Sequence, residues 1–104
     1  MRNKPHIKGD VAEALGQQHF LEEGKMVFKN VSQHGEIDFV TVDEDGKIEL
    51  VDVKSVSIRP RDGYIINRSP TELQKKLNVK ILYISTADEG GYKKGEIFYN
   101  KKTI

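Results

Sequence analysis

One stretch of the chain, residues 47–56, is apolar on both of its faces when it is read as a β-strand. Side chains alternate along a strand, so Ile48 and Leu50 share one face while Val51 and Val53 share the other. A strand that is apolar on both faces must be covered on both, which is typical of an interior strand. The chain is therefore expected to fold around a sheet with covering layers.

This strand is expected to belong to a β-hairpin. Residues 36–42 and 47–56 are both rich in β-branched side chains, and the sequence Asp-Glu-Asp-Gly at 43–46 separates them. A two-residue loop would place Asp38 and Asp52 on opposite faces, whereas a three-residue loop pairs them directly. Asp at the first turn position and Gly at the fourth suit a type I turn with a G1 bulge, which favours the three-residue loop.

The other elements complete an α+β domain. In addition to the hairpin, the patterns predict a helix over 10–23, a strand over 26–31, a short strand at 64–66, a helix from 69 to about 77, and strands over 79–86 and 95–100. The main order is α-β-β-β-α-β-β, which indicates a mixed central sheet flanked by helices. A chain of 104 residues allows one such domain, spanning 1–104.

Both predicted helices carry end signals. Gly24 is expected to end the first helix in a left-handed conformation. Ser69, Pro70 and Glu72 fit an N-cap, a first helical residue and a capping-box partner for the second helix. The inward face of the first helix is expected to comprise Val11, Ala14, Leu15, Gln18 and Leu21.

The composition limits the kinds of metal site, disulfide and membrane segment that the chain can form. The chain has no cysteine, so it has neither a disulfide nor a cysteine-based zinc site, and a metal would have to bind carboxylates, histidines, carbonyls or water. No apolar run reaches the roughly 20 residues of a membrane span, and the first residues lack the apolar region of a signal peptide. We therefore expect a cytoplasmic protein with no membrane partner.

Charge is distributed unevenly although the net charge is +1. Residues 36–52 hold seven acidic residues and one lysine, a net charge of −6, while residues 53–80 hold seven basic and two acidic residues, a net charge of +5. This pattern is consistent with a metal site beside a track for a polyanion. A solvated surface with no such role is the alternative.

The hairpin carboxylates are the candidate site. If Asp38 pairs with Asp52, like charges face each other across the ladder, with Lys54 two residues along. A divalent cation would turn this repulsion into binding, and Mg²⁺ typically uses one or two carboxylates together with substrate phosphate oxygens. Lys54 is suited to orienting or helping to deprotonate an attacking water. Exposed charges on an amphipathic strand are the alternative interpretation.

Three segments resemble the PD-(D/E)xK nuclease superfamily, especially its small Holliday-junction-resolvase-like and phage-type endonucleases. They are Gly-Asp-x-x-Glu at 9–13, Gly-Glu-Ile-Asp-Phe-Val at 35–40 and Leu-Val-Asp-Val-Lys-Ser at 50–55. Ile37 stands where the motif has proline, and Asp52 uses the aspartate option of the motif. The resemblance implies a restriction-endonuclease-like core of order α-β-β-β-α-β.

The resemblance also implies roles for individual residues. Asp38, Asp52 and Val53 would hold Mg²⁺, or Mn²⁺ in its place, and Lys54 would be the catalytic lysine. Glu13 would be an additional acid aimed at the metal, although it also suits a capping box with Asp10. The basic stretch would contact DNA phosphates through Arg59, Arg61, Arg68, Lys75 and Lys76, and Gln74 joins this DNA-contacting set because several related nucleases have an analogous glutamine at the site. For Gln74, an exposed helical glutamine without a role is the commoner case.

The function expected from these residues is metal-dependent hydrolysis of phosphodiester bonds in DNA, and the resolvase resemblance implies a structure-specific form of it. Cutting both strands of a duplex would require a homodimer, because each chain has one site. One alternative is a catalytically inactive nucleic-acid-binding module with the same fold. Another is an α+β interaction domain whose carboxylates are surface charges.

Overall fold

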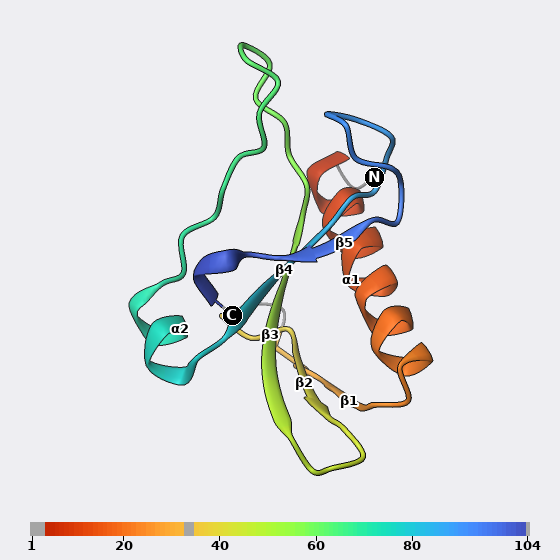
Figure 1. Cartoon of the computed structure of the whole chain (residues 1–104), viewed down its shortest axis with the longest axis vertical. Coiled ribbons are helices and arrows are strands. Elements are labelled where there is room, and N and C mark those ends of the chain that lie inside the picture. The colour runs from red at the N-terminus through yellow and green to blue at the C-terminus, as the bar shows by residue number, and fades with distance from the viewer. Residues whose placement is uncertain (1–3, 33–34, 104) are drawn as a thin grey trace.

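The computed structural model describes residues 4–32 and 35–103. In chain order its elements are α1 (Lys4–Glu22), β1 (Met26–Lys29), β2 (Phe39–Val42), β3 (Ile48–Ser55), α2 (Glu72–Leu77), β4 (Lys80–Ile84), β5 (Ile97–Tyr99) and the 3₁₀ turn η1 (Lys101–Thr103). The strands form one sheet in the order β1-β2-β3-β4-β5 (Figure 1). The β3–β4 pair is parallel and the other pairs are antiparallel, which confirms the α+β fold with a mixed sheet.

Helix α1 packs against one face of the sheet, and of the side chains predicted to face it, Leu15 packs against the core. Ala12 and Phe20 are buried, whereas Val11 and Leu21 are 37% and 54% exposed. Between the buried pair, a Cβ on Gly16 would lie 3.2 Å from side-chain atoms of Val53 and Ile84, tighter than most real contacts. The helix therefore approaches the sheet closely at Ala12 and Gly16, which the pattern of large apolar residues did not reveal.

The start of α1 also differs from the prediction. The helix begins at Lys4, six residues before Asp10, so Asp10 is not its N-cap and Glu13 is not a capping-box residue. A proline at position 5 fits this earlier start, because proline is tolerated in the first turn of a helix. The end of the helix agrees with the prediction: Gly24 has a φ of +78°.

The hairpin has the predicted register. Phe39 pairs with Val51, and the loop closes as the Asp43 N–H donates to the Lys47 carbonyl at 3.1 Å. Gly46 takes a φ of +81°, as the G1 bulge requires. The three-residue loop is thus confirmed, and it places Asp38 beside Asp52 at the end of the ladder.

The opposite face of the sheet carries a second apolar cluster. Val56, Ile81 and Tyr83 are buried there. Phe98 stacks on Tyr83 with ring centroids 5.2 Å apart, and Tyr92 stacks on Phe98 at 5.0 Å. This cluster supports the long connection that leaves β3, in which the predicted strand at 64–66 is reduced to a bridge between Ile58 and Ile65.

Helix α2 ends at Leu77 as predicted but begins later. Its N-cap is Thr71, not Ser69, because the Thr71 hydroxyl accepts from the Gln74 N–H and the Gln74 side chain accepts from the Thr71 N–H. Both Ser69 with Glu72 and Thr71 with Gln74 satisfy the capping-box spacing, and the fold uses the second. Across residues 4–32 and 35–103, no helix is long and apolar enough to cross a membrane.

Candidate functional site

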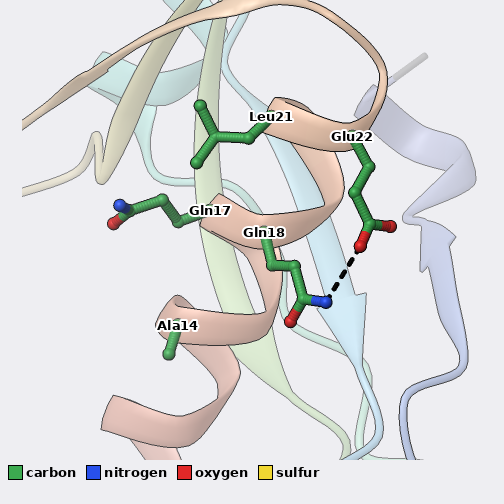
Figure 2. Close-up of a pocket in the computed structure, with 5 residues that line it drawn as sticks. All are labelled: Ala14, Gln17, Gln18, Leu21 and Glu22. Atoms are coloured by element: carbon green, nitrogen blue, oxygen red, sulfur yellow. Dashed lines mark hydrogen bonds between the residues drawn. The ribbon is translucent and has the colours of Figure 1, made fainter.

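Two surface hollows differ in their chemistry. One, of about 400 Å³, lies on the outer side of α1 and is lined by Ala14, Gln17, Gln18, Leu21 and Glu22 (Figure 2). Two of its lining side chains are bonded to each other, since Gln18 Nε2 donates to Glu22 Oε1 at 2.9 Å. The other, of about 320 Å³, lies between β3 and the N-terminus of α2 and contains Asp52, Lys54, Arg68 and Gln74. Acid, base and amide side chains thus meet in the second hollow, which we call the cleft.

The two candidate metal-binding acids lie together at the end of the β2–β3 ladder. Asp52 is 3% exposed, and its carboxyl group is close enough to that of Asp38 for the two to affect each other's protonation. Asp38 Oδ2 also accepts from the Val53 N–H at 2.6 Å, which fixes the carboxylate against the neighbouring strand. The Val53 side chain is buried in the apolar core, so only the main chain of this residue is available to a ligand.

Side-chain amides hold the segment that leads into Asp38. Gln74 Nε2 donates to the Glu36 carbonyl at 2.9 Å, and Asn30 Nδ2 donates to the Ile37 carbonyl at 2.8 Å. The Asn30 N–H donates to the Asp38 carbonyl at 2.9 Å. Three successive carbonyls are therefore bonded, so the backbone carrying Asp38 is fixed although β2 begins only at the next residue.

Gln74 also reaches the second acid. Its side chain is 4% exposed, and Nε2 donates to Asp52 Oδ2 at 2.9 Å. Lys54 Nζ lies 3.4 Å from the same oxygen and is 42% exposed, so its ammonium group opens onto the cleft. Gln74 was expected among the DNA-contacting residues, but its amide is engaged within the protein, where it positions Asp52.

Burial governs the protonation of the two acids. Burial, with a smaller contribution from the contact with Asp38, raises the pKa of Asp52 to about 6 against the opposing effects of Lys54 and Gln74. Burial likewise raises the pKa of Asp38, a rise opposed by the Val53 N–H and increased by the negative charge of Glu13. Both acids therefore hold a proton more tightly than an exposed aspartate does.

Glu13 lies near the pair without completing a three-acid ligand set. It is half-buried on α1, and its charge is close enough to Asp38 to raise the pKa of that carboxyl. Throughout the ranges 4–32 and 35–103, no group of three or more His, Cys, Asp or Glu is arranged to hold a metal ion. The two adjacent carboxylates nevertheless fit Mg²⁺, a hard cation that commonly takes one or two carboxylates and fills its other positions with water and substrate oxygens.

The basic residues divide into three locations. Arg68 lines the cleft, Arg59 and Arg61 lie on the connection after β3, and Lys75 and Lys76 are exposed on α2. Arg59 is paired with Asp62 at 2.9 Å. The structure thus brings Arg68 to the cleft and places the other four cations outside it, on the connection after β3 and on α2.

Several residues at the site were not singled out from the sequence. Asn30, Glu36 and Thr71 contribute to its framework, and the Thr71 hydroxyl donates to the Glu36 carboxylate. The overlapping capping-box pattern of Thr71 and Gln74 was a usable signal for the helix start. Nothing local in the sequence indicates that Asn30 bonds the segment before Asp38.

Comparison with known proteins identifies a fold. Neither a protein-family description nor a curated protein matches the sequence. The solved structure of a bacterial homing endonuclease, I-Ssp6803I, matches with a TM-score of 0.61 and 21% sequence identity. The match covers 80% of this chain and 63% of that endonuclease, so the chain spans less than two thirds of it. The chain therefore shares its fold with a protein known as an endonuclease.

Proposed function

We propose that this chain is a metal-dependent DNA endonuclease of the PD-(D/E)xK type. The observation that carries the proposal is the adjacent pair of carboxylates, the half-buried Asp38 and the buried Asp52, with the Lys54 ammonium group 3.4 Å from Asp52 Oδ2. Burying two adjacent acids raises their pKa values, a cost that a bound cation would offset. The fold shared with a homing endonuclease supports the same reading.

Asp38 and Asp52 would hold the Mg²⁺ ion, with Mn²⁺ as a substitute, and the Val53 carbonyl as a further ligand. When bound, the ion would polarise the scissile phosphate and lower the pKa of the attacking water. Lys54 would orient this water and stabilise the charge that develops on the phosphate. Gln74 would keep Asp52 in position, since its amide donates to Asp52 Oδ2.

DNA would lie over the cleft. Arg68 lines the cleft, and Lys75 and Lys76 are exposed on α2, whose N-terminus borders it. Contacts of these cations with phosphates would orient the substrate without reading its sequence. A two-fold dimer would bring two such sites to a duplex or to a four-way junction, the substrate class of the resolvase-like relatives.

The test is cleavage of a DNA panel by the full chain. Supercoiled plasmid, linear duplex, single strand, flap and four-way junction are incubated with Mg²⁺, with Mn²⁺ or with EDTA. We expect cleavage only with metal, and we expect Asp38→Asn and Asp52→Asn to abolish it. Asp45→Asn is the matched control, because it removes an exposed carboxylate from the same hairpin away from the site.

The results separate the alternatives. Binding of DNA without cleavage under any condition would identify an inactive nucleic-acid-binding module. Absence of DNA binding would identify an interaction domain and overturn the proposal. Cleavage of the junction in preference to linear duplex would establish the structure-specific form, and sedimentation of the protein–DNA complex would show whether two chains act together.

A further inference from the structure

We propose that residues 57–66, which we call the arm, form a two-stranded ribbon that enters the major groove of duplex DNA and reads bases at a fixed distance from the cleft. This inference rests on the proposed function, because it extends DNA binding from the cleft to a second surface. The arm leaves the end of β3 and projects beyond the sheet, as the green loop at the top of Figure 1 shows.

The base of the arm is a fixed part of the fold. Ile58 and Ile65 form an antiparallel bridge, the Ile66 N–H donates to the Ser57 carbonyl at 2.8 Å, and the Arg59 N–H donates to the Tyr64 carbonyl at 2.9 Å. The two isoleucines pack against the apolar cluster that contains Tyr83. The arm is therefore a paired ribbon with a packed base.

Asp62 shapes the tip. Its Oδ1 accepts from the Tyr64 N–H at 3.0 Å and from Arg59 Nε at 3.2 Å, and its Oδ2 lies 2.9 Å from an Arg59 guanidinium nitrogen. Gly63 completes the turn with a φ of +74°. Because Arg59 is engaged in holding the turn, the exposed Arg61 and the 68% exposed Tyr64 are the tip side chains available to a partner.

The dimensions of the arm favour the major groove. Residues 60–62 form the turn that ends the ribbon, which the Gly63 N–H closes by donating to the Arg59 carbonyl at 2.9 Å, so Arg61 lies at its outer end. A two-stranded ribbon fits the width of the major groove, about 12 Å. The minor groove, about 6 Å wide, is too narrow for a paired ribbon with side chains. Arginine is also the side chain that most commonly recognises guanine in the major groove.

Both ends of the arm are tied to the cleft. At one end, the arm follows β3, which carries Asp52 and Lys54. At the other end, the Arg68 N–H donates to the Tyr83 hydroxyl at 2.7 Å, and Asn100 Nδ2 donates to the Arg68 carbonyl at 2.8 Å. The distance from the tip to the acids is therefore set by the fold, so a base read by Arg61 would lie at a constant separation from the cut.

The test is selection of binding sites from a library of duplexes with randomised sequence, using the wild-type chain in EDTA so that cleavage is not needed. We expect one to three neighbouring positions to show a base preference. Arg61→Ala and Tyr64→Ala should erase this preference and weaken binding to the best sequence by about 10-fold, the loss of one good base contact. Arg61→Lys, which retains the charge but not the planar fork, should lose the preference while keeping more of the affinity.

Lys47→Ala is the control, because it removes an exposed cation from the far end of β3. It should leave the selected sequence unchanged. Equal weakening of all sequences by Arg61→Ala would mean that the arm contacts phosphates only, and this result overturns the inference, as would the absence of any selected preference. Cleavage in Mg²⁺ is measured separately. A selected base preference without cleavage would refute the proposed catalysis alone. Cleavage whose base-preference profile Arg61→Ala leaves unchanged would refute the inference alone.

Discussion

Replacing Asp52 with asparagine should stabilise the metal-free protein at neutral pH while abolishing cleavage. Asp52 is 3% exposed and lies against Asp38, so its ionisation places a second negative charge in a dry site. Asparagine has nearly the same shape. Its oxygen can accept from Gln74 Nε2, and its amide can donate to Asp38, which replaces repulsion between carboxylates with a hydrogen bond.

The size of the effect follows from the protonation of Asp52. Its pKa rises from an ordinary 3.8 to about 6, chiefly because of burial. Each pKa unit corresponds to about 1.4 kcal/mol, so ionised Asp52 destabilises the fold by about 3 kcal/mol relative to its protonated form. A raised pKa means that the folded state holds the proton more tightly than the unfolded chain. The wild-type protein should therefore lose stability as the pH rises from about 4 to about 6, and it should not regain this contribution above that range.

Thermal melts in EDTA at pH 4, 5, 6, 7 and 8 measure this effect. The melting temperatures of the wild type and Asp52→Asn should coincide near pH 4 and differ by about 12 °C or more above pH 7, because about 3 kcal/mol corresponds to roughly 4 °C or more per kcal/mol for a domain of this size. Saturating Mg²⁺ should then raise the wild-type melting temperature far more than that of the variant. Asp45→Asn should follow the wild type throughout.

Two results would refute this reasoning. If the variant and the wild type differ by the same amount at every pH, ionisation of Asp52 is not the cause of the difference. If Mg²⁺ stabilises both proteins equally, Asp52 is not a metal ligand.

Three further predictions concern the surroundings of the acids. Gln74→Ala should lower the free energy of unfolding by about 2 kcal/mol in urea melts, because it removes a helix-capping hydrogen bond and the buried bond to Asp52. The control, Gln18→Ala, removes an exposed side chain and should cost less than about 0.5 kcal/mol. Equal losses would contradict this role of Gln74. Gly90→Ala should destabilise the protein by about 1 kcal/mol more than Gly91→Ala. Both glycines have positive φ, but only at Gly90 would a Cβ meet the Ile58 side chain, at 2.3 Å; equal melting temperatures would show that this side chain moves aside freely. Lys54→Ala should reduce the single-turnover cleavage rate far more than DNA affinity, and a loss confined to affinity would remove its proposed role.

The sequence predicted the parts of the fold that depend on neighbouring residues. The hairpin register followed from the Asp43 and Gly46 turn positions, and this register brings Asp38 beside Asp52. Turn chemistry acts over a few residues, so it can be read without knowing the rest of the structure. The ends of α1 and α2 at Gly24 and Leu77 were predictable for the same reason.

Features that depend on distant contacts were not predictable. The inward stripe of α1 is set by the close approach of Gly16 to the sheet, although glycine gives no apolar signal. The bond from Gln74 to Asp52 joins positions 22 residues apart and exists only because α2 caps the cleft. Asn30 could equally have been a loop residue exposed to solvent, and only the folded chain places its amide on the Ile37 carbonyl.

The parallel β3–β4 pair has a consequence for the order in which the site assembles during folding. The strands β1, β2 and β3 are connected by short segments, so they can form early through contacts of low sequence separation. The pairing of Val51 with Lys80 must wait for the intervening connection to close, with a corresponding loss of chain entropy. Gln74 belongs to that connection, whereas Asp38 and Asp52 belong to the early meander. The two acids are therefore expected to meet first, and the amide that holds Asp52 arrives in the slower step.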